Sequence, residues 1–213
     1  WTSRVAGLSG VPDSNAGNYT WPYKNNSYPN HRSVIYPPTG GPAVRYHEVH
    51  NSIDTLNKAV SRAGGITFTQ HDRFRTSGHA VEVGMELTSG WRNYIARVPD
   101  LFHDPLNSGA RLGFVANGDT HRRAPGLSGA LTGIYAKELT VEAIFEALRN
   151  RRCFATNGSR ILVDARANGI FMGQDVMIKD NAVNLTLRSV GTRPIVSVVL
   201  IRDGEEIQRF PGN

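Results

Sequence analysis

The run Ser-Ile-Asp-Thr-Leu-Asn-Lys-Ala-Val-Ser-Arg-Ala-Gly-Gly-Ile-Thr-Phe-Thr-Gln-His (52–71) decides the fold class, because it joins a helix, a stop and a strand in one short stretch. Ser52 can cap a helix over 52–63, whose apolar residues recur at helical spacing, and Gly64-Gly65 ends it. Residues 66–69 are typical of a strand, which runs directly into Gln70-His71. A helix followed at once by a strand favours an α/β protein.

The same alternation continues outward from this unit up to about residue 158. Its order implies an α/β layer or a barrel with parallel strands. The expected elements are strands at 31–36, 66–69, 80–84 and 112–116, and helices at 52–63, 91–101 and from Thr140 to the arginines at 149–152.

After residue 158 the chain predicts strands without helices. This pattern indicates a small antiparallel sandwich-like region over 159–213, open to truncation at its end, after a first domain over 1–158. The strands are expected at 160–165, 183–188, 195–201 and 206–210, with turns at Asn168-Gly169, 179–181 and Asp203-Gly204.

The composition narrows the class of protein. With 213 residues and 39% hydrophobic content, the chain is typical of a soluble globular protein, and it has no apolar run of the ~20 residues that a membrane helix needs. The net charge of +6 comes largely from arginine, which favours a small anionic substrate. No Lys/Arg-rich block supports nucleic-acid binding, which we do not expect.

The single cysteine and the chain ends carry further expectations. Cys153 excludes a disulfide framework and a cysteine zinc cage, and we expect a buried structural thiol. The chain starts with Trp1 and ends soon after a strand-like segment, so we expect a segment of a longer protein that lacks its N-terminal part. The compartment, cytoplasmic or exported, and the oligomeric state stay open.

Asp119 and His121 form the main candidate site. They follow a short apolar strand and Asn117-Gly118, in the run Phe-Val-Ala-Asn-Gly-Asp-Thr-His-Arg (114–122). Residues i and i+2 of an extended segment point the same way, and oxygen with nitrogen suits zinc, manganese or iron. A turn aspartate and a surface histidine are the alternative.

Other polar residues stand near predicted strand ends. His71 follows its strand, as Asp119 and His121 follow theirs, which is where sites form in parallel α/β folds. His31 opens its strand and Glu82 lies inside one, where it could equally face solvent. Glu86 is a rival carboxylate.

Four runs in this chain, at 63–71, 80–83, 113–121 and 138–158, carry a resemblance to a known family. They resemble the polymerase-and-histidinol-phosphatase (PHP) metal-dependent hydrolases, in the branch that contains carbaryl hydrolase. The resemblance implies a distorted β/α barrel, present here in part, that holds two or three divalent metal ions, usually zinc, manganese or iron. The implied metal ligands are His31, His71, Asp119 and His121, with Glu82 as a neighbour.

The chain also departs from that family. The family's opening His-x-His strand and a Glu before the position of Trp1 do not occur here, and Gln70-His71-Asp72 replaces a His-His-Pro. About half the expected metal ligands would therefore lie outside this chain.

The function expected from these residues is metal-dependent hydrolysis of a phosphoester or a carbamate/ester-like substrate. Asp119 and His121 would act with the metal, Arg122 or Arg123 would face an anionic group, and the long loop 1–30 would shape the pocket. A non-catalytic binding or structural module is the alternative, and a nucleotide phosphatase or a polymerase-associated proofreading role is a third.

Overall fold

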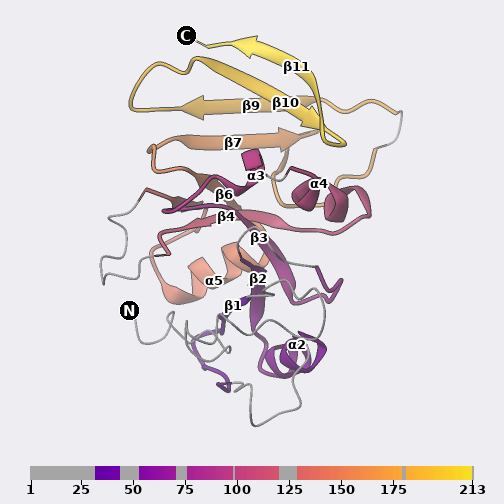
Figure 1. The fold of residues 1–213 in the computed structure, drawn as a ribbon, viewed down its shortest axis with the longest axis vertical. Helices are drawn as coiled ribbons and strands as arrows, with labels where there is room; N and C mark the ends of the chain where they lie inside the picture. Colours follow the sequence, from indigo (N-terminus) through magenta and orange to yellow (C-terminus); the bar gives the residue numbers. More distant parts are fainter. Residues whose placement is uncertain are drawn as a thin grey trace.

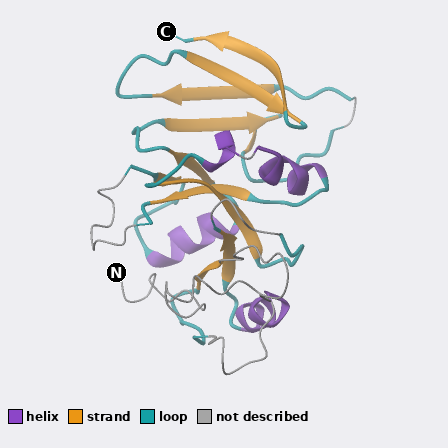
Figure 2. Ribbon diagram, in the orientation of Figure 1, coloured by secondary structure: helices purple, strands orange, loops and turns teal. Residues whose placement is uncertain are grey.

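A four-stranded mixed sheet carries the amino-terminal part of the fold (Figures 1 and 2). The computed structural model describes residues 32–43, 53–70, 76–97, 99–119, 129–178 and 181–212. The first pair of strands is antiparallel and the next two pairs are parallel. In spatial order the strands are β1 (Arg32–Ile35), β2 (Ile66–Thr69), β3 (Glu82–Ser89) and β4 (Gly113–Asn117).

Two helices cover opposite faces of this sheet. Side chains alternate between faces along β2, so Ile66 and Phe68 face one way and Thr67 the other. Helix α5 (Val141–Arg149) packs on the face of Ile66 and Phe68. Helix α2 (Ile53–Arg62) packs against Val34, which pairs with Thr67.

Two shorter helices cover the later part of β3. They are α3 (Tyr94–Arg97) and α4 (Pro99–Asn107), and their Tyr94 and Phe102 are buried with Met85 in a third core cluster. These helices replace the single helix expected over 91–101. Pro105 lies inside α4 and obscures its periodicity in the sequence.

The rest of the described chain is antiparallel. The strands β5 (Leu131–Ile134) and β6 (Cys153–Thr156) pair, β7 (Leu162–Ala167) lies between β8 (Ile170–Phe171) and β9 (Leu185–Val190), and β10 (Ser197–Arg202) pairs with β11 (Glu205–Pro211). Figure 1 shows β7, β9, β10 and β11 stacked above the four-stranded sheet.

Two of the predicted turns are confirmed. Asn168 and Gly169 join β7 to β8 with φ angles of 50° and 80°, and Asp203 and Gly204 join β10 to β11 with 55° and 84°. Positive φ at both central residues is the type I′ hairpin geometry that Asn-Gly and Asp-Gly favour.

The expected mixed α/β class is confirmed, with more strand than helix in the described chain. The expected parallel strands are present in the pairs β2–β3 and β3–β4, but the pair β1–β2 is antiparallel. Apolar patterning specifies which face of a strand is buried but not its direction. Among the described residues the sheet β1–β4 is open, and no barrel closes.

Strand β3 is longer than the sequence predicted. We expected it to end at Gly84, but it continues to Ser89. A Cβ at Gly84 would lie 2.6 Å from the Phe68 ring and 3.0 Å from the Gly113 carbonyl oxygen. Gly84 therefore permits close packing in the middle of a strand, and it does not mark a stop.

The two parts of the chain on either side of residue 158 are packed together. The Tyr135 hydroxyl donates to the Val163 carbonyl at 2.8 Å, and its ring meets Phe171 edge-on at 4.8 Å. Arg151 Nε donates to the Gly173 carbonyl at 2.9 Å. The division into domains at 158 and 159 stays a prediction.

Within the described ranges, no helix is long and apolar enough to cross a membrane.

The core under α5 gives a first test. Leu148 is 6% exposed and packs in the cluster of Ile66 and Phe68. We expect Leu148→Ala to lower the free energy of unfolding by about 2–5 kcal/mol, because truncation loses burial and leaves a cavity. Urea unfolding measures it. The control Leu139→Ala removes a side chain that is 85% exposed and should change little; equal effects would show that the core is misplaced.

Candidate functional site

The carboxyl ends of β2, β3 and β4 lie at one edge of the sheet, because these strands are parallel. Chain segments that leave this edge gather side chains into one region, as in other open parallel sheets. Here Gln70 follows β2, Gly90 follows β3, and Gly118-Asp119 follow β4. This carboxyl edge is the candidate functional site.

Asp119 has an unusual backbone. Its φ angle is +46°, in the left-handed region that, apart from glycine, mainly aspartate and asparagine adopt. Hydrogen bonds hold the turn that contains it: Gly90 N donates to the Asn117 carbonyl at 3.0 Å, and Trp91 Nε1 donates to the Asp119 carbonyl at 2.6 Å. The turn is thus fixed from β3 and the loop that follows it.

A side-chain bond inside the sheet supports the same turn. Asn117 Nδ2 donates to Glu86 Oε1 at 3.0 Å, and Glu86, in the middle of β3, is fully buried. A buried carboxylate is costly unless it accepts hydrogen bonds. Glu86 thereby joins β3 to the end of β4 directly before Asp119.

Hydrogen bonds between residues close in sequence order the loop after β3. The Ser89 hydroxyl lies 2.8 Å from the Tyr94 hydroxyl and accepts from Trp91 N at 3.1 Å. Thr88 Oγ1 donates to the Arg92 carbonyl at 3.0 Å. These bonds set the position from which the Trp91 indole reaches Asp119.

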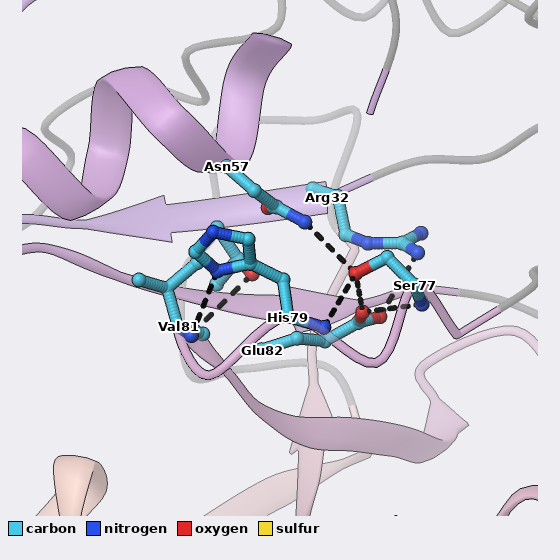
Figure 3. A network of polar contacts seen from close by, with 7 residues as sticks. Arg32, Asn57, Ser77, His79, Val81 and Glu82 are labelled. Atoms are coloured by element: carbon cyan, nitrogen blue, oxygen red, sulfur yellow. Dashed lines mark hydrogen bonds and ion pairs between the residues drawn. The ribbon is translucent and has the colours of Figure 1, made fainter. Parts of the chain in front are cut away.

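Glu82, at the start of β3, belongs to a second buried network (Figure 3). Its Oε1 lies 2.9 Å from Nη2 of Arg32, and both side chains are at most 1% exposed. Its Oε2 accepts from Ser77 N at 2.7 Å and from Ser77 Oγ at 2.5 Å. The alternative in which Glu82 faces solvent is therefore wrong.

Ser77 connects this ion pair to helix α2 and to the turn before β3. Its Oγ accepts from Asn57 Nδ2 at 2.9 Å and from His79 N at 3.2 Å, and His79 Nδ1 accepts from Val81 N at 3.3 Å. Burial lowers the pKa of the Arg32 guanidinium, and the charge of Glu82 and its hydrogen bond oppose that shift. An opposing carboxylate is what a buried guanidinium needs to keep its charge.

The predicted site residues are only partly within the described chain. Asp119 and Glu82 are described, whereas His31, His71, His121 and Arg122 lie outside the described residues, as do Arg123 and the loop 1–30. The residues that flank two of these histidines are adjacent: Arg32 pairs with Thr69, and Gln70 Nε2 donates to Ser33 Oγ. Within the described ranges no three His, Cys, Asp or Glu side chains form a group that could hold a metal ion.

The sequence did not indicate Trp91, Asn117 or a role for Glu86. Asn117 stood out only as part of an Asn-Gly turn, and Glu86 only as a rival carboxylate. Their roles depend on contacts between β3 and β4, which local patterns do not encode. Glu86 lies 31 positions before Asn117 in the chain.

In comparisons with known proteins, only part of this chain is similar to a family or to a relative. The matching family model is described as "Protein of unknown function (DUF3604)" and covers residues 88–190. An uncharacterized protein of Chlamydia muridarum (strain MoPn / Nigg) is 26% identical over 123 residues. Another, of Chlamydia trachomatis serovar D, is 28% identical over 123 residues. Each alignment covers 49% of this chain and only 19% of the relative. No solved structure matches.

These findings correct the expected PHP family. The model that matches is a different family, and the names of both relatives assign them no hydrolase activity. Two of the four runs on which the resemblance depended, 63–71 and 80–83, lie before the matched residues. Short strand-and-turn runs recur in α/β proteins because backbone geometry favours the same residues, which is how such a likeness arises.

The prediction of a structural thiol at Cys153 agrees with its surroundings. The side chain is 5% exposed in the core under α5, and burial raises the pKa of the thiol to about 11. The nucleophilic thiolate is therefore scarce at neutral pH.

Breaking the buried ion pair tests its importance. We expect Arg32→Met to lower the free energy of unfolding by about 3–5 kcal/mol, because Glu82 stays buried without its counter-ion. Urea unfolding measures the change. The control Lys58→Met removes an exposed pair with Asp54 and should cost less than about 1 kcal/mol. If both variants unfold alike, the buried pair does not constrain the fold.

Cys153 gives a test by pH. Between about pH 9 and 11 the thiol stays protonated in the folded chain and ionises in the unfolded chain, so the free energy of unfolding should fall as pH rises through this window. Iodoacetamide at pH 8 should label Cys153 slowly in buffer and fast in urea. Fast labelling of the folded chain would contradict the burial of this thiol.

Proposed function

We propose that this chain supplies part of the divalent-metal site of a hydrolase that acts on a small, anionic phosphoester or a carbamate/ester-like substrate. Asp119 would hold metal together with His121, His31 and His71, and Arg122 would face the anionic group. Oxygen and imidazole nitrogen are the donors that zinc, manganese and iron accept in proteins.

The observation that supports this proposal best is the backbone of Asp119. A left-handed aspartate, fixed by Trp91 and by the bonds to Asn117, sits at the carboxyl edge of three parallel strands. Backbone strain that several contacts maintain is found disproportionately at functional sites. Asp203 adopts a similar φ of 55° in the β10–β11 hairpin, so what distinguishes Asp119 is its place at the carboxyl edge together with its contact to Trp91.

The chemistry divides between the ions and the chain. Two or three divalent ions, when bound, would supply hydroxide at neutral pH by lowering the pKa of coordinated water to about 7. The chain would orient the Asp119 carboxylate, neutralise the substrate through arginine, and bring the donors from three strand ends to one edge.

Glu82 has partners within the protein. Arg32 and Ser77 occupy its two carboxylate oxygens, so metal binding by Glu82 would require it to give up one of them. We propose that its main contribution is to hold the start of β3 against β1. Its role as a metal ligand stays a prediction.

The partial barrel, the cell compartment and the kind of ligand also stay predictions. A partial barrel would require the open sheet β1–β4 to close through residues outside the described ranges. We continue to expect a soluble protein, cytoplasmic or exported, that binds a small molecule and not a nucleic acid.

A non-catalytic binding module is the second candidate, and one observation favours it. A groove of about 390 Å³ lies between β9 and the hairpin β10–β11. Apolar side chains line most of it, and several of them, such as Leu185, Leu187 and Phe210, are more than a third exposed. A partly open apolar groove of this kind is typical of a binding surface.

The variant Asp119→Ala tests the enzyme. We expect the intact protein to contain zinc, manganese or iron, and to hydrolyse p-nitrophenyl phosphate or a p-nitrophenyl carbamate until a chelator removes the metal. Asp119→Ala should lower hydrolysis by about 100-fold or more, since even indirect partners of a metal cost 10- to 100-fold.

The matched control is Asp175→Ala, which removes an exposed carboxylate paired with Arg111 and should leave hydrolysis unchanged. Circular dichroism should show unchanged helix content in both variants. Full activity in the metal-free protein, or in Asp119→Ala, would rule out the proposed function.

A further inference from the structure

We propose that Glu86 and Asn117 are positioning residues: the hydrogen bond between them fixes the turn that presents Asp119. The structural half of this inference concerns the turn alone. Its functional half, an effect on metal binding, rests on the proposed function.

Burial of the Glu86 carboxylate costs free energy of folding. Glu86 is fully buried in the middle of β3, and its neighbours along the strand, Met85 and Leu87, belong to an apolar core cluster. A carboxylate without water needs strong hydrogen-bond donors, and Asn117 supplies one at 3.0 Å. An apolar residue would pack here without needing hydrogen-bond donors. We infer that the carboxylate has a role other than packing.

This role concerns Asn117, the last residue of β4. Asn117 is anchored twice, by its side chain to Glu86 and by its carbonyl to Gly90 N at 3.0 Å. Only Gly118 separates it from Asp119. With Asn117 fixed in side chain and backbone, the chain leaves the sheet in one direction.

The direction matters because Asp119 makes its own contact two residues later. Its carbonyl accepts from Trp91 Nε1 at 2.6 Å, with φ at +46°. If Asn117 rotated, the Asp119 carbonyl would leave the indole and the backbone could relax to a more common conformation. The Glu86–Asn117 bond and the Trp91–Asp119 bond are therefore coupled through the backbone of residues 117–119.

The indole N–H of Trp91 reports this coupling without any metal. In the ¹H–¹⁵N spectrum of the intact protein, the signal that disappears in Trp91→Phe identifies it. We expect Glu86→Leu, which removes the acceptor, to speed the hydrogen exchange of this N–H at least about tenfold, as expected for a locally opened bond. Glu86→Gln keeps a carbonyl acceptor for Asn117 and should retain the wild-type exchange rate.

Two further variants keep the result interpretable. Met85→Leu replaces the buried neighbour on the same strand and should leave the indole signal unchanged. Asn117→Ala removes the donor instead of the acceptor and should act like Glu86→Leu, so the inference stays testable if Glu86→Leu does not fold. Slow exchange in the folded Glu86→Leu or Asn117→Ala variant would overturn the inference. Fast exchange in Glu86→Gln would also overturn it, because charge and not the bond would then hold the turn.

Calorimetric titration with Mn²⁺ alone tests the functional half. We expect Glu86→Leu to bind Mn²⁺ about 10- to 100-fold more weakly than wild type, the usual effect of residues that orient a ligand. Equal binding by Glu86→Leu and wild type would refute that half. If wild type binds no Mn²⁺ while the indole results are as expected, the positioning role stands and the proposed function fails.

Discussion

One buried ion pair, between Arg32 and Glu82, holds the strands of the amino-terminal sheet together. Arg32 begins β1 and Glu82 begins β3, so the pair reaches across β2, where Thr67 and Thr69 are fully buried. Two charges without water must remain together, because each one alone would be costly to bury. Ser77 binds the other oxygen of Glu82 and so ties the preceding turn and α2 to the same pair. The antiparallel edge strand is thereby fixed to the parallel part of the sheet.

Strand β3 carries a second buried carboxylate, and the two act in opposite directions. Glu82 binds toward β1, and Glu86 binds Asn117 at the end of β4. The strands of a parallel sheet covered on both faces are normally continuous apolar runs. Polar groups that are expensive to bury are maintained at functional sites more often than elsewhere. Of the two departures from the apolar pattern in β3, Glu82 lies at the amino end of the strand, and Glu86 leads to the carboxyl edge at which Asp119 has its left-handed backbone.

What the sequence predicts well is local chemistry. Thr140 caps α5 by accepting from Ala143 N, and the Asn168-Gly169 and Asp203-Gly204 turns form because these residues tolerate positive φ. What it misses depends on distant partners. The sequence predicted a strand end at Gly84, because it does not show the contacts of Gly84 with Phe68 and Gly113. It left Glu82 open between a site residue and a solvent-facing one, and only the contact with Arg32 decides that it is buried. The position of Asp119 after a strand was predictable, but its conformation was not, since Trp91 and Asn117 fix it from other segments.

The two candidate functions draw on different parts of the chain, so evidence for one does not count against the other. Of the residues that line the apolar groove, Ser189 has the only polar side chain, and none offers an imidazole or carboxylate. The side chains of that groove therefore offer apolar contact and one hydroxyl, and further hydrogen bonds would have to come from backbone groups. The sheet edge near Asp119 has the opposite character, with the buried Glu86 carboxylate and an ordered loop. Tyr135, directly after β5, is hydrogen-bonded to β7, and Arg151, directly after α5, to Gly173, so the strands that carry the groove contact the part of the chain that contains the sheet. Catalysis at the edge and binding in the groove are therefore compatible in one protein.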